Sequence, residues 1–266
     1  MPFNQRKNHT LLILFILIIL FNASGSFAQK LSMAEAKHAG DSIIPEAILP
    51  FWQSLTLKEK VAQTLMVYMP SASYIKKHQF GGVLIMKPHL KDTLHLKEEL
   101  SLANESLKIP LLTAIDQEGG KVNRLQAISP EWKNLPSAKE MRTMTDDSVY
   151  NLAKQIGNAL HHYGINLNLA PVLDPPKDSK GKPSFIEVSN RSFGEFETAV
   201  PKIRSFVKGM KESKVLSTSK HFPGYDSWTN SDHQIAFSTS SKEIILRNVE
   251  LFKEFADEIP VVMLSS

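Results

Sequence analysis

The chain has 266 residues, enough for one large domain or two small ones, and it carries 31 lysines and arginines against 27 acidic residues. It contains no cysteine, which excludes disulfides, thiolate-based zinc or iron–sulfur sites, and a lipid anchor on a cysteine. The nearly balanced charge shows no basic stripe, so the sequence predicts no nucleic-acid partner.

The N-terminus has the pattern of a secretory leader. Basic residues precede an unbroken apolar run over residues 11–21, and small residues follow at 26 and 28. A helix of this length rises only about 16 Å, too short for a hydrocarbon core of about 30 Å. We therefore predict a signal peptide over residues 1–28, cleaved after Ala28. The mature protein would be periplasmic or extracellular, without a stable membrane span. An uncleaved membrane anchor is the alternative.

Residues 29–54 are predicted to be a lead-in, and residues 55–266 a single domain in which short apolar runs alternate with amphipathic stretches. Glycine, proline or charged residues bound each run, as is typical of strands buried on both faces of a parallel sheet. The apolar runs cover residues 61–69, 82–86, 110–115, 165–173, 215–219 and 260–264.

Helical periodicity follows some of these strands. Gly164 suits the position just after the end of the first clear helix. The helical patterns cover residues 146–163, 197–213 and 243–257. Capping boxes are predicted at Thr56 with Glu59 and at Ser240 with Glu243. Alternating strands and helices indicate an α/β fold with parallel strands. Six strands fit either a doubly wound sheet or six units of a (β/α)₈ barrel, so periodicity leaves both open.

Polar residues follow the strands at their C-terminal ends, where α/β folds build their sites. The third strand leads into Asp116, a pair of glycines and Arg124. A carboxylate and a guanidinium can hold sugar hydroxyls, although a solvated salt bridge in a turn explains this composition equally well. The fourth strand ends at Asp174, which is expected to cap a turn or support a neighbour. Arg191, in the loop that follows, has polar neighbours and a length that can reach inward.

The fifth strand ends in Lys220 and His221, which point to opposite sides if the chain stays extended. The polar loop beyond them contains Asp226, Asp232 and His233. An aspartate beside a histidine suggests proton transfer, because imidazole titrates near neutrality and a carboxylate can orient it.

Four segments together resemble a known family: IDQEGGKVNRL, LNLAPVLD, NRSFGE and KHFPGYDSWTNSDH. They are similar to the N-terminal barrel domain of glycoside hydrolase family 3, and the last is most similar to its β-N-acetylhexosaminidase branch. The resemblance runs from about Leu55 to the end of the chain. It implies an α/β fold of the (β/α)₈ TIM-barrel kind, here incomplete with about six β/α units.

The resemblance also implies a function. Members of this branch remove terminal β-linked N-acetylglucosamine from glycans such as peptidoglycan fragments or chitooligosaccharides, with retention, and need no metal or cofactor. The implied carbohydrate-binding residues are Asp116, Arg124, Arg191, Lys220 and His221. The implied acid/base is His233, in a dyad with Asp232.

The loop departs from the family pattern. The family reads Asp-Ser-His where this chain reads Ser231-Asp232-His233, so the aspartate is displaced by one position. In an extended loop, that slip turns the carboxylate to the other side of the backbone. Either Asp232 or Asp226 is therefore left as the partner of His233.

A second departure concerns the nucleophile. Retaining hydrolysis needs a carboxylate nucleophile, which the family supplies at the end of a seventh strand. The chain ends at Ser266 after the sixth, and no residue matches the nucleophile, so we expect a domain truncated at its C-terminus. A sugar-binding pseudoenzyme is one alternative. A β-glucosidase of the same family is another, although such enzymes lack the histidine-bearing loop seen at residues 230–233.

Overall fold

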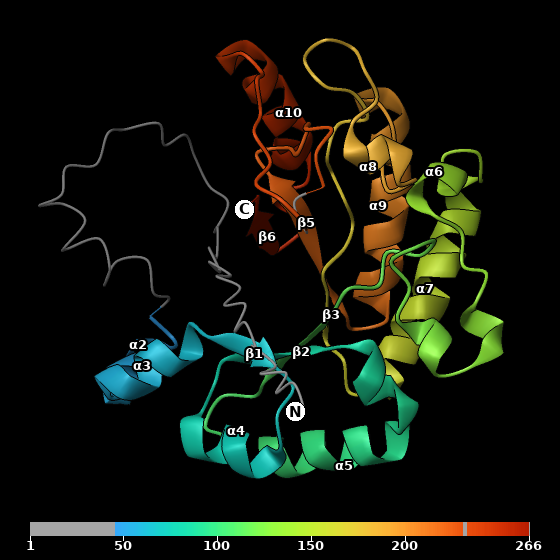
Figure 1. Cartoon of the computed structure of the whole chain (residues 1–266). Helices are drawn as coiled ribbons and strands as arrows, with labels where there is room; N and C mark the ends of the chain where they lie inside the picture. The colour runs from blue at the N-terminus through green and yellow to red at the C-terminus, as the bar shows by residue number, and fades with distance from the viewer. Residues whose placement is uncertain (1–45, 231–232, 266) are drawn as a thin grey trace, which may run out of the picture.

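A computed structural model of the chain describes residues 46–230 and 233–265, so the predicted leader lies outside the described residues. Six strands form one sheet in chain order, and each strand pairs in parallel with the next. The sheet curls into a half-barrel with helices on its outer side (Figure 1). The strands are β1 (Met66–Tyr68), β2 (Gly82–Ile85), β3 (Leu112–Ile115), β4 (Leu167–Asn168), β5 (Leu216–Phe222) and β6 (Val261–Leu264).

Helices alternate with the strands along the described chain, which begins with two helices before β1. None of the helices in residues 46–230 and 233–265 is long and apolar enough to cross a bilayer. The α-helices are α2 (Leu49–Ser54), α3 (Leu57–Gln63), α4 (Ala72–His78), α5 (Thr93–Asn104), α6 (Ala138–Met141), α7 (Asp146–His162), α8 (Phe185–Val188), α9 (Phe196–Glu212) and α10 (Lys242–Glu254). Short 3-10 helices are η1 (Lys87–Lys91), η2 (Leu125–Ala127) and η3 (Pro130–Trp132).

The predicted strand over residues 61–69 is wrong in its first half, because Val61 lies in α3 and β1 begins only at Met66. The predicted capping box at the start of α3 is confirmed. Thr56 Oγ1 accepts a hydrogen bond from Glu59 N at 3.3 Å, and Glu59 Oε2 accepts one from Thr56 N at 2.7 Å. These two bonds satisfy backbone groups at the start of a helix, which favours helix over strand here.

The predicted helices at residues 146–163, 197–213 and 243–257 are confirmed as α7, α9 and α10, with ends that differ by at most three residues. Gly164 follows α7 with a φ of 78°, as its predicted position requires. The predicted capping box at Ser240 is wrong. The N-cap of α10 is Ser241, because the Ser240 hydroxyl is bonded to the carboxylate of Asp226 instead.

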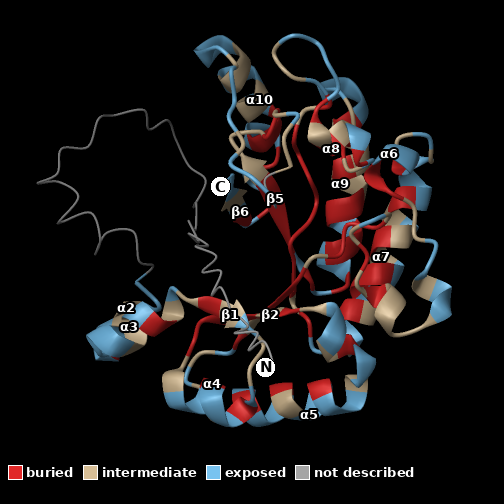
Figure 2. Ribbon diagram, in the orientation of Figure 1, coloured by how far each residue is buried: buried red, intermediate tan, exposed pale blue. Residues whose placement is uncertain are grey.

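The interior of the fold lies between the sheet and its outer helices, and the buried faces of α7 and α9 meet there (Figure 2). Ile156 and Phe206 are almost fully buried, and each such side chain contributes about 1.5–3 kcal/mol by leaving water. The two helices approach closely at Gly209, where a Cβ atom would lie 2.6 Å from Tyr150 O. This packed layer supports β4 and β5, whose C-terminal ends carry most of the candidate site.

Candidate active site

Lys220 brings two strand ends together. It lies in β5 with 2% of its side chain exposed, and its Nζ is 2.7 Å from Asp116 Oδ1 and 2.6 Å from Glu118 Oε1. Asp116 directly follows β3, so the two acidic residues and the lysine meet where parallel strands end at the same edge. The structure thus brings together Asp116 and Lys220, two of the residues that the family resemblance implies for carbohydrate binding.

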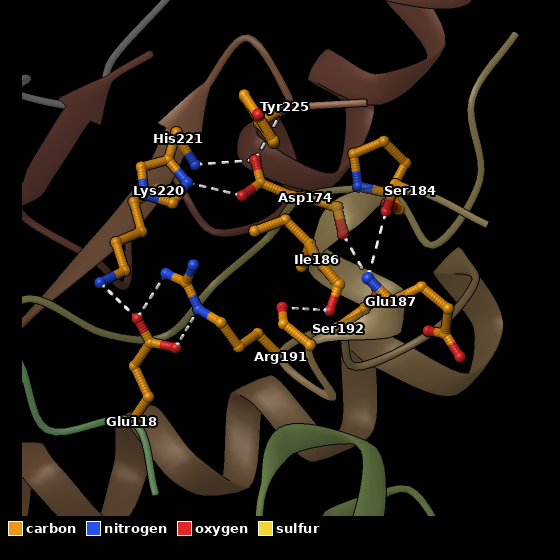
Figure 3. Close-up of polar contacts among 12 residues, drawn as sticks. Glu118, Asp174, Ser184, Ile186, Glu187, Arg191, Ser192, Lys220, His221 and Tyr225 are labelled. Carbon is orange, nitrogen blue, oxygen red and sulfur yellow. Dashed lines mark hydrogen bonds and ion pairs between the residues drawn. The ribbon is translucent and has the colours of Figure 1, made fainter. Parts of the chain in front are cut away.

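Glu118 is the centre of this cluster. Arg191 donates to it from Nε and Nη2, both at 2.8 Å, in the two-pronged geometry that suits a guanidinium and a carboxylate (Figure 3). Burial alone would raise the pKa of Glu118, but the charges of Lys220 and Arg191 outweigh it and lower the pKa to about 2. The carboxylate therefore stays ionised at any physiological pH.

The two cations are held in their charged forms as well. Burial acts to lower the pKa of Lys220, but the carboxylates of Asp116 and Glu118 outweigh it, and the pKa is raised. Burial likewise opposes the charge of Arg191, and Glu118 raises its pKa in spite of that. Glu118, Lys220 and Arg191 thus form an array of alternating charges that stay fixed in their ionised forms.

Polar contacts fix the loop that carries Asp116 and Glu118. The side chain of Asn168, at the end of β4, accepts from Gln117 N at 3.0 Å and donates to Gln117 O at 2.9 Å. Gln117 Oε1 accepts a hydrogen bond from the backbone N–H of Arg124, with an N···O distance of 2.7 Å. This loop therefore folds back on itself, and Arg124 Nη2 comes to lie 4.0 Å from Asp116 Oδ2.

Asp174 organises a second, adjacent group. Its buried carboxylate lies 2.6 Å from His221 Nδ1 and accepts the backbone N–H groups of His221 at 2.9 Å and Tyr225 at 2.7 Å (Figure 3). A carboxylate only accepts, so His221 Nδ1 carries the hydrogen and a neutral ring keeps Nε2 as an acceptor. Asp174 thus supports a neighbour, as expected. The peptide bond between Lys220 and His221, inside β5, is cis.

The structure places the predicted acid/base apart from these contacts. His233 is exposed, and its backbone N donates to Asn230 O at 3.2 Å. Its predicted partner Asp232 lies outside the described residues. The other candidate partner, Asp226, is buried and accepts a hydrogen bond from the Ser240 hydroxyl. Among the described residues, no hydrogen bond or ion pair joins the His233 side chain to Lys220 or to its partners Asp116 and Glu118.

Sequence reasoning passed over Glu118, although a signal was present. Residues two apart on an extended segment share a face, so Glu118 was placed to point the same way as Asp116. Nothing in the sequence indicated that Asn168 would pin Gln117 between them. Within the described part of the chain, histidine and acidic side chains form no group of three or more that could hold a metal ion.

Fold and site define an α/β half-barrel protein with a buried polar site at the C-terminal ends of its strands. Residues 56–265 match the family model of the glycosyl hydrolase family 3 N terminal domain, so the chain belongs to that family. The resemblance seen in the sequence motifs is confirmed, and with it the barrel-like α/β fold with parallel strands.

Similar proteins carry related names. A β-hexosaminidase of Actinobacillus pleuropneumoniae serotype 5b is 30% identical over 183 residues, which cover 65% of this chain and 50% of that protein. β-Hexosaminidase LpqI of Mycobacterium tuberculosis is 28% identical, over 70% of this chain and 47% of its own length. A family 3 β-N-acetylglucosaminidase structure from Paenibacillus sp. has a TM-score of 0.67 at 28% identity, covering 80% of this chain and 42% of that chain. The chain spans about half the length of the curated relatives it matches.

Proposed function

We propose that the protein is a glycosidase that removes terminal β-linked N-acetylglucosamine from glycans such as peptidoglycan fragments or chitooligosaccharides, with retention. The observation that carries the proposal is the Asp116 carboxylate. It is held between Lys220 and Arg124 with 27% of its side chain exposed, so it presents acceptor atoms in a fixed place. Sugar hydroxyls are donors of the matching kind. The names of the similar proteins support the sugar class.

Exposure separates two kinds of residue in the site. Arg124, Arg191 and His221 keep 17–23% of their side chains exposed, so with Asp116 they can meet a sugar directly. The side chains of Glu118 and Asp174 are only 5% exposed or less, and they hold the other residues in place. Lys220 is 2% exposed, and two of the three N–H groups on its Nζ have carboxylate partners, so one donor is left for a sugar.

The acid/base of the proposed reaction is His233, with Asp232 or Asp226 as its partner. The position of His233 on an exposed loop beyond β5 supports this role, because such a loop can fold over a bound sugar. The imidazole would then protonate the leaving oxygen and later accept a proton from water.

Hydrolysis of a chromogenic β-N-acetylglucosaminide tests the proposal. The protein to assay is the full product of the gene, including any residues encoded after Ser266. We expect turnover of this substrate and little or none of the matching β-glucoside. Preference for the glucoside would favour a β-glucosidase instead.

A second candidate function is sugar binding without hydrolysis, and one observation favours it for the 266 residues alone. The site carboxylates Asp116, Glu118 and Asp174 each have a cationic or imidazole partner, so none is assigned as the nucleophile. We expect the 266-residue form to bind N-acetylglucosamine in a calorimeter but to hydrolyse no glycoside above background. Turnover by that form would exclude the binding-only function.

Export is proposed from the leader at residues 1–28 alone. Sequencing the N-terminus of protein recovered outside the cytoplasm tests it, and we expect that sequence to begin at Gln29. A protein that retains its leader would favour the anchored alternative.

A further inference from the structure

The loop over residues 190–192 carries Arg191, whose guanidinium is paired with Glu118. Contacts outside this ion pair hold the backbone of the loop in place. The backbone groups on both sides of Arg191 are bonded to α6 or to the residue that caps it. Asn190 O accepts from Lys139 N at 3.2 Å, and Ser192 O accepts from the guanidinium of Arg142. The short helix α6 and the residue that caps it therefore hold the backbone of the loop on both sides of Arg191.

Arg142 provides most of the hydrogen bonds between α6 and this loop. Its Nε lies 3.0 Å and its Nη2 2.7 Å from Ser192 O, so two donors converge on one carbonyl oxygen. The same guanidinium is bonded to the carboxylate of Glu187 in α8, with Nη1 at 3.3 Å from Oε1. Its side chain is 20% exposed and that of Glu187 16%, so solvent screens the pair only in part.

Glu187 belongs to a different group from Glu118. Its carboxylate is turned away from the Arg191 fork (Figure 3), and its contacts are with Arg142 and Lys139. Its helix is joined to the loop, because Arg191 N donates to Ile186 O at 2.9 Å. The contacts thus run in series from Arg142, through Ser192 and α8, to the backbone of Arg191.

We propose that Arg142 is a positioning residue that fixes the direction of the Arg191 guanidinium. The role of the contact between Arg142 and Ser192 O follows from the bidentate geometry of the Arg191–Glu118 pair. A two-pronged pair with Glu118 survives only if the backbone of Arg191 stays in place, because a small rotation breaks one of the two bonds. The side-chain bonds of Arg142 go to Ser192 O and to Glu187, neither of which is a proposed sugar-binding residue, so its effect on the site passes through Arg191.

The chain offers a matched control in Arg204. This arginine on α9 bonds the carboxylates of Glu254 and Glu258, with Nε 3.0 Å from Glu258 Oε1. Among the described residues, no hydrogen bond or ion pair joins it to the 190–192 loop. Arg204→Ala therefore removes an ion-paired arginine that is more exposed than Arg142, 44% against 20%, and that is not bonded to the loop of Arg191.

The test follows the hydrogen on Arg191 Nε by ¹⁵N nuclear magnetic resonance, with the signal assigned by its loss in Arg191→Lys. In the wild type, exchange of this hydrogen with water should be slow because Glu118 holds it. Arg142→Ala should speed the exchange about tenfold or more, an equilibrium cost of about 1.4 kcal/mol. Arg204→Ala should leave it unchanged. Exchange in Arg142→Ala as slow as in the wild type would overturn the proposal.

A second variant keeps the test decisive if Arg142→Ala does not fold. Arg142→Lys retains the charge opposite Glu187 but has no fork to reach Ser192 O as well, so exchange should again be faster than in the wild type. A merely stabilising role would lower the melting temperature of both variants and leave exchange at Arg191 unaltered.

Affinity for N-acetylglucosamine gives a further readout, which rests on the proposed function. Arg142→Ala should weaken binding about tenfold, and Arg204→Ala should not change it. If the wild type does not bind the sugar, the proposed function is wrong, while the exchange measurement still decides the role of Arg142.

Discussion

Asp174 contacts His221 twice, through Nδ1 of the ring at 2.6 Å and through the backbone N–H at 2.9 Å. One carboxylate thus sets both the place of the residue and the direction of its ring. The contact with Nδ1 also selects the tautomer, which leaves Nε2 as the atom available to a ligand.

Asp174→Asn should alter this histidine specifically. An amide can present its N–H₂ to the ring, which favours hydrogen on Nε2 in place of Nδ1. Loss of a charge-assisted bond costs about 1.5–3 kcal/mol, so sugar affinity should fall roughly tenfold to a hundredfold. The ¹⁵N shifts of the His221 ring report the tautomer directly. An unchanged tautomer would show that Asp174 does not set it.

Glu118→Gln should destabilise the fold strongly. The substitution leaves Lys220 and Arg191 buried with one anion fewer, a loss that typically costs about 3–5 kcal/mol. Urea unfolding measures the change in the free energy of unfolding. The matched control is Glu212→Gln, whose partner Lys154 is 42% exposed, and its cost should stay within about 1 kcal/mol. Equal costs would mean that burial of the Glu118 pair is unimportant.

The same carboxylate predicts how stability depends on pH. The pKa of Glu118 is lowered from 4.5 to about 2, so its contribution to stability is present above about pH 4.5 and is lost as pH falls toward 2. The shift corresponds to roughly 3 kcal/mol. The difference in unfolding free energy between the wild type and Glu118→Gln should be constant near neutrality and shrink below pH 4.5. A difference that does not change with pH would contradict the lowered pKa.

His233→Ala tests the proposed acid/base in a form that hydrolyses the chromogenic substrate. Its kcat should fall roughly 10²–10⁴-fold, the usual range for losing such a group, with little change in sugar affinity. Asp226→Asn and Asp232→Asn, assayed beside it, identify the carboxylate that supports the histidine. Since Asp226 is bonded to Ser240, we expect the larger kinetic effect from Asp232. An unchanged rate in His233→Ala would remove this residue from the reaction.

Local signals in the sequence were enough for most of the framework. Apolar runs between glycine, proline and charge predicted the strands, and a period of 3.6 predicted α7, α9 and α10. They failed at the start of α10, where a residue 14 positions earlier in the chain competed for a side chain. Ser240 bonds Asp226 and leaves the cap of α10 to Ser241.

The sequence alone determined that polar residues follow strands which end at one edge, because parallel strands all end on the same side of a sheet. Only the tertiary structure decided which residues pair there. Lys220 meets Asp116 across 104 positions and Arg191 meets Glu118 across 73. Pairing over such separations depends on strand register, on the hydrogen bonds of Asn168 to the loop at Gln117, and on the contact of Arg142 with Ser192 O. None of these leaves a local pattern in the sequence.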